Sequence, residues 1–144
     1  MPYYAHVRQD ESGENIYQTV AEHLTGTATL CREFAADFGA EADGELTGLT
    51  HDLGKCTDAF QKRLLEGGPV VDHATAGMLA CIKMKRPSAA ACVAGHHGGL
   101  LDVGNLRTDR AGEATLSGRF KKGMEEHYLE RCGESGVTLP TLPP

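Results

Sequence analysis

The feature that most constrains this chain is the return of apolar residues at three- and four-residue steps, in runs that glycine or proline closes. In residues 18–38 one helical face carries Val20, Leu24, Thr27, Cys31, Phe34 and Phe38, and Gly39 follows. This spacing is typical of an amphipathic helix that buries one side. A strand-like alternation of useful length occurs only over residues 2–7. The pattern therefore predicts an all-α fold, a bundle of short helices.

The same pattern predicts five more helices, over residues 45–53, 57–65, 72–85, 89–96 and 116–128. We expect Gly54 to end the first of them as a left-handed C-cap. Thr57 and Ser88 are expected to cap the helices that follow them, and Pro87 prevents a helix from continuing. Nine of the 18 glycines follow Ala94, so the last third is expected to be rich in loops. We expect one domain over residues 1–132 and a Pro-rich linker or disordered tail over 133–144.

Composition limits the class of protein. With 40% hydrophobic and 24% charged residues, the 144-residue chain suits one globular domain. No apolar run approaches the roughly 20 residues that span a bilayer, so we expect no membrane partner and a cytoplasmic location. The five cysteines form no C-x-x-C pair, which argues against a zinc ribbon, and Cys31, Cys81 and Cys92 are expected in the core. There is no phosphate loop of an ATPase either.

Histidines supply the candidate chemistry. Four of the seven lie beside glycine, aspartate or another histidine, and with His23 and one aspartate they form the candidate metal ligands: His23, His51, Asp52, His73, His96 and His97. A carboxylate can bridge two metals while imidazoles hold the outer positions. From spacing alone, ordinary packing or capping roles for these histidines stay open. His6 and His127 are given no metal role.

Four strings in order identify a resemblance: Glu22-His23-Leu24, then Gly48 to Lys55, then Asp72 to Gly77, then Gly95-His96-His97-Gly98. Together they resemble the HD-domain nuclease of the CRISPR type I helicase-nuclease, within the HD phosphohydrolase superfamily. The opening Tyr3-Tyr4-Ala5-His6 is similar to the start of the subtype I-C proteins. The resemblance extends over residues 3–101 and implies an HD-domain helical bundle with a metal site between its helices.

By this resemblance, His23, His51 and Asp52 hold one metal, and Asp52 shares the second with His73, His96 and His97. Asp52 and Lys55 are the implied catalytic residues, with Lys55 beside the scissile phosphate. The implied cofactors are two divalent transition metals, Mn, Fe, Co or Ni, with Mg or Zn also open, because nitrogen ligands dominate. No other cofactor is expected. The implied reaction is hydrolysis of single-stranded DNA by metal-activated water, in antiviral defence.

The resemblance also implies partners: a helicase domain or subunit that feeds the strand, and an RNA-guided surveillance complex. One departure is that the family adds a metal-binding aspartate from a later helix, and this chain ends before such a helix. Asp102 or Asp109 is the available substitute. Two alternatives therefore stay open. The chain could be an HD nucleotide or cyclic-nucleotide phosphohydrolase, or a catalytically silent metal-binding module docked on a helicase or surveillance complex.

The net charge of −6 does not exclude DNA. The acidic excess lies in residues 1–45, which carry −7, whereas residues 107–122 carry +3. Bound divalent cations would add positive charge at the site itself. We therefore expect weak, salt-sensitive DNA binding by the isolated chain.

Overall fold

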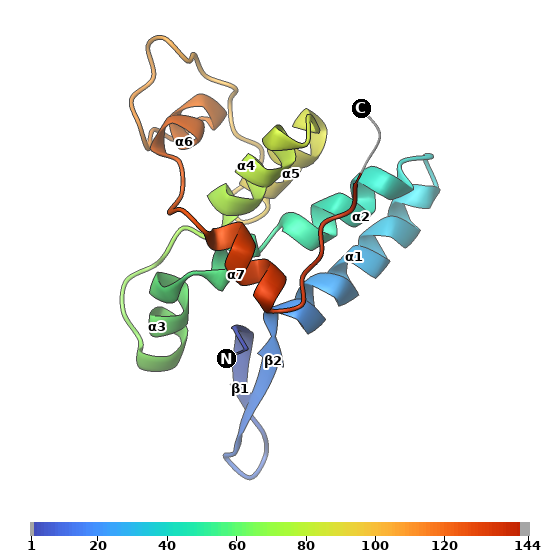
Figure 1. Ribbon diagram of the computed structural model, residues 1–144, viewed down its shortest axis with the longest axis vertical. Coiled ribbons are helices and arrows are strands. Elements are labelled where there is room, and N and C mark those ends of the chain that lie inside the picture. The colour runs from blue at the N-terminus through green and yellow to red at the C-terminus, as the bar shows by residue number, and fades with distance from the viewer. Residues whose placement is uncertain (1, 142–144) are drawn as a thin grey trace.

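The computed structural model describes residues 2–141, and over that range it is predominantly helical (Figure 1). A β-hairpin, β1 (Tyr4–Gln9) and β2 (Asn15–Thr19), precedes seven α-helices and one short 3-10 helix. The helices are α1 (Val20–Ala36), α2 (Glu41–Thr50), η1 (Leu53–Cys56), α3 (Asp58–Glu66), α4 (Ala74–Lys83), α5 (Pro87–Gly95), α6 (Leu116–Lys122) and α7 (Tyr128–Glu134). The predicted helical fold class is confirmed.

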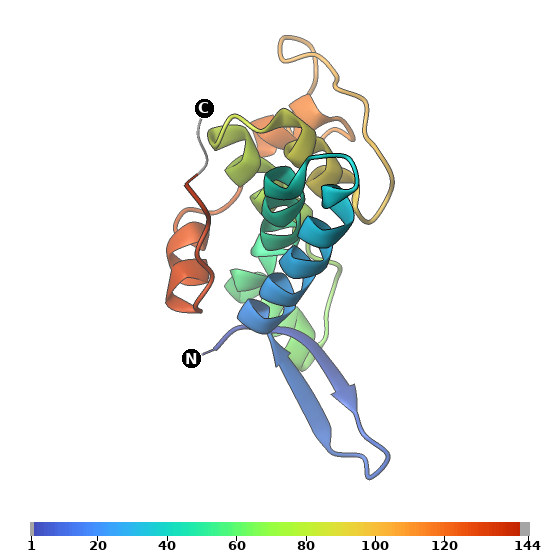
Figure 2. The ribbon, with the colours of Figure 1, turned by 90° about the vertical axis from the view of Figure 1, so that its right-hand side faces the viewer.

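The hairpin is the part of the fold that the helical periodicity does not contain. Its strands pair antiparallel, with Val7 opposite Tyr17, and it projects away from the helical body (Figures 1 and 2). The candidate strand at residues 2–7 is thus real, but it begins at Tyr4, continues to Gln9 and has a partner strand that the sequence pattern does not show. Ala5 is buried and anchors the base of β1 against the helices.

Helix α1 begins directly after β2, at a capping box. The Thr19 hydroxyl accepts a hydrogen bond from the Glu22 amide, and the Glu22 carboxylate accepts one from the Thr19 amide, which satisfies free amides of the first turn. Val20 and Leu24 are fully buried as predicted. Phe34 and Phe38 are 70% and 76% exposed, so their predicted place on the core face is wrong. Helix α1 packs chiefly on α2 and extends outward together with it (Figure 1).

The link between α2 and α3 differs from the prediction. Helix α2 ends at Thr50, His51 is its C-cap, and the chain tightens into η1. Gly54 lies inside η1, so the predicted left-handed C-cap at this glycine is wrong. Thr57 caps α3 as predicted, since its hydroxyl accepts a hydrogen bond from the Phe60 amide. This short, buried link holds the His-Asp pair in a fixed orientation.

Helices α4 and α5 pack as a pair on α2. Pro87 occupies the first turn of α5, where its missing N–H costs nothing. Ser88 therefore lies inside the helix, and its predicted role as the N-cap is wrong. The predicted helix over 116–128 is too long, because Gly123 ends α6 with φ of 67°, and α7 begins only at Tyr128, after His127 with φ of 70°. The apolar residues keep their helical spacing in the sequence, but the backbone leaves the helical conformation between α6 and α7.

Two groups of buried side chains stabilise this arrangement. One joins the hairpin, α1, η1, α4 and α7 and includes Leu24 and Leu53; the other joins α2, α4 and α5 around Leu46, Met78 and Val93. Each fully buried aliphatic side chain contributes about 1.5–3 kcal/mol. The predicted ligands His51 and Asp52 lie between these two groups, where α2 passes into η1.

Three cysteines were predicted in the core. Cys81 is buried there, Cys31 is partly exposed, and Cys92 is exposed, which makes its predicted core position wrong. Beyond α7, Val137 is buried against the first group of core residues. The predicted boundary after residue 132 stays a prediction, and residues 142–144 of the predicted tail lie outside the described range. None of the helices between residues 2 and 141 combines the length and apolar character that crossing a membrane requires.

Candidate metal centre

Asp52 lies at the centre of the site. It follows the last turn of α2 and precedes η1, and its side chain is only 5% exposed. Its two carboxylate oxygens face different groups of side chains. Oδ2 faces α1 and the end of α2, whereas Oδ1 faces α4 and the end of α5. A carboxylate in this position can contact cations on both sides.

The first side joins His23 from α1 to the His-Asp pair. The Nε2 atoms of His23 and His51 lie 3.0 and 3.2 Å from Asp52 Oδ2, and 3.1 Å from each other. Ligands about 2.1 Å from a shared six-coordinate ion lie about 3.0 Å apart. The three atoms therefore have the mutual spacing of neighbouring ligands to one metal.

The second side brings together histidines from α4 and α5. His73 Nε2 and His96 Nε2 lie 3.5 and 3.3 Å from Asp52 Oδ1, and His73 Nε2 lies 2.6 Å from His97 Nε2. The ligand atoms of these four residues all lie within 4.8 Å of one another. The five predicted histidine ligands thus gather around the Asp52 carboxylate, and the six residues come from four separate segments of the chain.

Backbone carbonyls orient three of the imidazoles. The Nδ1 atoms of His51, His73 and His96 donate to the carbonyls of Gly48, Val71 and Val93, at 2.8, 2.9 and 2.7 Å. A carbonyl only accepts hydrogen bonds, so Nδ1 carries the proton in the neutral ring. Each Nε2 then presents a lone pair toward Asp52. This outer hydrogen bond is the usual support of a metal-bound histidine.

The donor set fits a divalent cation. Asp52 Oδ1 is buried and has no hydrogen-bonding partner among the described residues. Burial raises the pKa of this carboxyl, whereas hydrogen bonds donated by the Nε2–H groups of His23, His51 and His96, when these rings are protonated, lower it by more. A buried anion surrounded by imidazole lone pairs is costly by itself, and a cation compensates it. The cluster is therefore suited to binding divalent metal.

Three glycines of the recognised strings allow the segments to approach so closely. A Cβ atom on Gly48 would lie 2.5 Å from the Cα of Ala28 in α1, and one on Gly54 would lie 2.5 Å from the Cα of His73. A Cβ on Gly77 would overlap the carbonyl oxygen of Thr50 at the end of α2. These contacts set α1 and α4 against the His-Asp link, so the glycines position ligands that they do not contact.

Lys55 is also part of the cluster. Its ammonium lies 2.9 Å from Asp52 Oδ2, donates to the Ala5 carbonyl and lies 3.3 Å from His6 Nε2, and its side chain is 6% exposed. In this structure it neutralises the carboxylate and joins η1 to β1. The predicted contact with a scissile phosphate stays a prediction.

The sequence interpretation missed His6. The ligand atoms of His6, His23 and Asp52 lie within 4.8 Å of one another, and the His6 ring meets that of His23 edge to face. Burial, Lys55 and His23 lower the pKa of His6. The only sequence signal at His6 is its place in the candidate strand over residues 2–7, and that signal does not indicate contact with His23 or Asp52.

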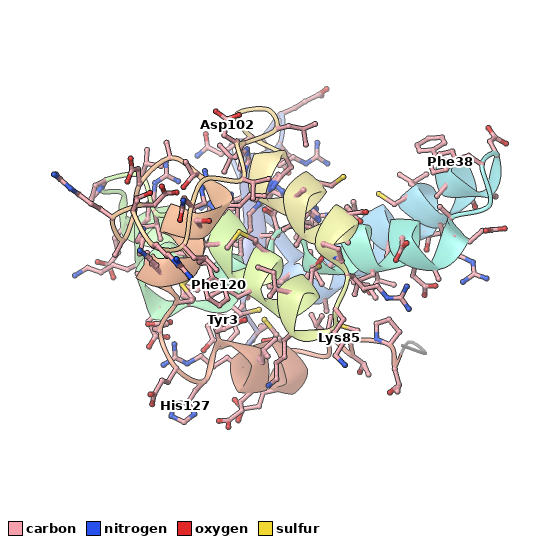
Figure 3. All side chains as sticks on the ribbon, turned by 90° about the horizontal axis from the view of Figure 1, so that it is seen from above. Tyr3, Phe38, Lys85, Asp102, Phe120 and His127 are labelled. Atoms are coloured by element: carbon pink, nitrogen blue, oxygen red, sulfur yellow. The ribbon has the colours of Figure 1, made fainter. Side chains whose placement is uncertain are left out.

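The proposed substitutes for the later aspartate lie elsewhere. Asp109 accepts hydrogen bonds from the Thr115 hydroxyl and the Asn105 amide, and Asp102 lies in the loop before α6 (Figure 3). Among the described residues, neither belongs to the metal-ligand groups. His127 lies at the edge of the molecule and pairs with Glu130, in agreement with its exclusion from the site (Figure 3).

A family profile described as the HD domain matches residues 20–127, which contain every predicted ligand. No curated protein matches the chain significantly.

Proposed function

Because the chain belongs to the HD domain family, a superfamily of metal-dependent phosphohydrolases, we propose that it is a nuclease that cuts single-stranded DNA. The observation that carries this proposal is the two-sided carboxylate of Asp52 with histidines on both sides. We propose two divalent ions, one held by His23, His51 and Asp52. The other would be held by Asp52 with the histidines of α4 and α5.

The protein side chains have separate tasks in this reaction. When bound, the ions supply Lewis acidity and a water of lowered pKa, which phosphodiester hydrolysis needs. Asp52 would contribute an oxygen to each ion, and the hydrogen bonds from Nδ1 to backbone carbonyls orient the Nε2 atoms of His51 and His96 toward it. Lys55 keeps the carboxylate ionised and in place. Nitrogen-rich ligation favours Mn, Fe, Co, Ni or Zn over Mg.

Metal binding should stabilise the fold. After treatment with EDTA, we expect addition of Mn²⁺ or Co²⁺ to raise the unfolding temperature by several degrees, because saturating one site a hundredfold above Kd contributes about 2.7 kcal/mol. Differential scanning fluorimetry measures this shift. The His127→Ala protein serves as the control and should show the full shift, whereas His51→Ala should show a smaller one. An unfolding temperature that does not respond to metal would contradict the metal centre.

DNA cutting tests the proposed reaction. We expect Mn²⁺-dependent degradation of a labelled single strand by the wild-type protein and by His127→Ala, and at least a 100-fold slower reaction for His51→Ala. Both variants replace a histidine by alanine, but His51 belongs to the metal cluster and His127 does not. Circular dichroism confirms that both are folded. Equal cutting by both variants would show that the cluster does not catalyse the reaction.

A nucleotide phosphohydrolase is the second candidate function. A cavity of about 540 Å³ borders His73 and His97, a size within the range of small-ligand sites. Hydrolysis of mononucleotides or cyclic nucleotides without action on DNA would favour this alternative. Bound metal without turnover of either substrate class would favour the silent metal-binding module.

The wider setting follows from the resemblance in residues 3–101. We propose that the nuclease acts in CRISPR type I interference in the cytoplasm, with a helicase and an RNA-guided surveillance complex as partners. The isolated chain then depends on these partners for strand delivery. Copurification with a helicase, and activity on a strand displaced by the surveillance complex, test this setting.

A further inference from the structure

The cavity beside the second half of the metal cluster is lined by α3, α4, α6 and the segments that precede α4 and α6. Its volume is about 540 Å³, and His73 and His97 form part of its wall. A substrate whose reacting phosphate lies at the metal cluster would therefore extend directly into it. The lining residues come from segments distant in sequence.

Three cations line this cavity: Arg63 from α3, and Arg119 and Lys122 from α6. Two acids also line it, Asp72 and Glu113. The Asp72 carboxylate already accepts hydrogen bonds from the amides of Ala74 and Thr75 and from the Thr75 hydroxyl, so its charge is largely compensated at the start of α4. The Glu113 carboxylate accepts a hydrogen bond from the Arg110 amide. The cationic side chains thus outnumber the acids by three to two.

Arg63 is the cation that most needs a partner. Its Nε nitrogen is buried and has no hydrogen-bonding partner within the described residues 2–141. Arg119, by contrast, donates to the Ala94 carbonyl at 2.9 Å, and Lys122 lies 3.4 Å from Asp72 Oδ2. Buried polar groups are nearly always paired, and arginine binds phosphate through paired N–H donors. A guanidinium with an unpaired buried donor beside a metal centre suits an oxyanion.

The remaining wall is apolar and could receive the rest of a nucleotide. It is formed by small aliphatic side chains, namely Val70, Val71, Ala74, Ala94 and Ala114. A cavity that combines such a wall with a few convergent polar groups has the character of a small-ligand site. The phosphate of a nucleotide would contact the cationic side chains, and its base or sugar would contact the apolar wall.

We propose that this cavity is the subsite for the nucleotide unit that adjoins the reacting phosphate, with Arg63 and Lys122 binding its own phosphate group. The inference rests on the proposed phosphodiester hydrolysis at the Asp52 cluster and adds the substrate's position to it. The shared chemistry is a nucleoside phosphate, supplied by a nucleic acid strand or by a free nucleotide.

Binding of a fluorescein-labelled eight-residue oligothymidylate tests the subsite, by anisotropy in EDTA at low salt, so that the readout is independent of catalysis. We expect Arg63→Gln and Lys122→Gln each to weaken binding by about 5- to 10-fold and to reduce the salt slope by about 0.7, the value for one lost phosphate contact on a single strand. The matched controls are Lys62→Gln and Lys83→Gln, exposed lysines outside the cavity. They should change the affinity less than twofold.

Competition with thymidine monophosphate identifies the source of the phosphate. If thymidine monophosphate displaces the oligonucleotide from the wild-type protein but not from Arg63→Gln, the subsite is supported, with free nucleotides as ligands. Absence of displacement, with oligonucleotide binding still dependent on Arg63, would support it with a strand as ligand. Equal affinities for the cavity and control variants, or no binding by the wild-type protein, would overturn it. A wild-type protein that binds in this manner but cuts no DNA with Mn²⁺ would overturn the proposed nuclease instead.

Discussion

The Asp52→Asn protein is expected to bind neither metal ion, while His51→Ala and His96→Ala each lose one. Asp52 is the only described side chain whose two oxygens face both groups of histidines, Oδ2 toward His23 and His51 and Oδ1 toward His73 and His96. The asparagine amide has the same shape but no charge, and one of its two terminal atoms is a donor. We expect phosphodiester hydrolysis to fall at least about 10³-fold, equivalent to about 4 kcal/mol of transition-state stabilisation.

Metal analysis after dialysis, with isothermal titration by Mn²⁺, measures the number of ions bound. Asp102→Asn is the matched control, because this aspartate lies in an exposed loop outside the cluster (Figure 3). The Asp52 substitution also removes the carboxylate partner of the buried Lys55 ammonium, so circular dichroism must show that the variant is folded. The His96→Ala protein gives an independent test. If Asp52→Asn retained one ion at the wild-type affinity, the shared-carboxylate arrangement would be refuted.

The Gly77→Ala substitution is expected to have the largest effect on stability. A Cβ atom at Gly77 would overlap the Thr50 carbonyl oxygen and lie 2.8 Å from Val93 Cγ1, so α4 would have to move away from both α2 and α5. The carbonyl belongs to the backbone and cannot adopt another rotamer. We expect a loss of more than about 4 kcal/mol, a large part of the 5–15 kcal/mol that stabilises a typical domain. The variant should therefore be largely unfolded or insoluble.

Urea unfolding followed by circular dichroism measures this loss. The matched control is Gly26→Ala in the middle of α1, where a Cβ atom would meet nothing within 4 Å. Alanine has a helix propensity about 1 kcal/mol more favourable than glycine, so the control should be more stable than the wild type. The same chemical change thus has opposite expected signs at two helical glycines. An unchanged urea midpoint for Gly77→Ala would contradict the close packing of α4 on α2.

Helices were the most predictable part of the fold, because their signals are local. The Thr57 hydroxyl caps α3 through the amide three positions later, and Gly67, ten positions after Thr57, ends the helix. The errors occurred where tertiary contacts override a local pattern. Phe34 and Phe38 continue the apolar face of α1 in sequence, yet no other element covers them, and Gly54 packs inside η1 against His73. The hairpin was only half predicted, because β2 shows no strand alternation and depends on its partner for backbone hydrogen bonds.

The candidate ligands were identified from residue type and from the order of short strings in the sequence. Their division between two metals was an implication of the resemblance and stays a prediction; in the structure His23 and His51 lie beside one oxygen of Asp52, and His73 and His96 beside the other. His6 was missed because its only local signal is one position in a short strand. The cations of the neighbouring cavity had no local signal at all, since Arg63 and Lys122 are 59 positions apart.

The sequence by itself determined the helical class and the metal-ligating chemistry. Helix periodicity and capping operate over a few residues, and histidines and an aspartate beside small residues are visible as letters. Only the tertiary structure decided that Asp52 presents one oxygen to each group of histidines, that Lys55 is buried against it, and that Arg63 faces a cavity beside His73. These properties depend on contacts between helices distant in the chain. Close packing between segments sets these contacts, for example where Gly48 meets α1 and Gly54 meets His73. A local sequence pattern does not encode which segments will meet.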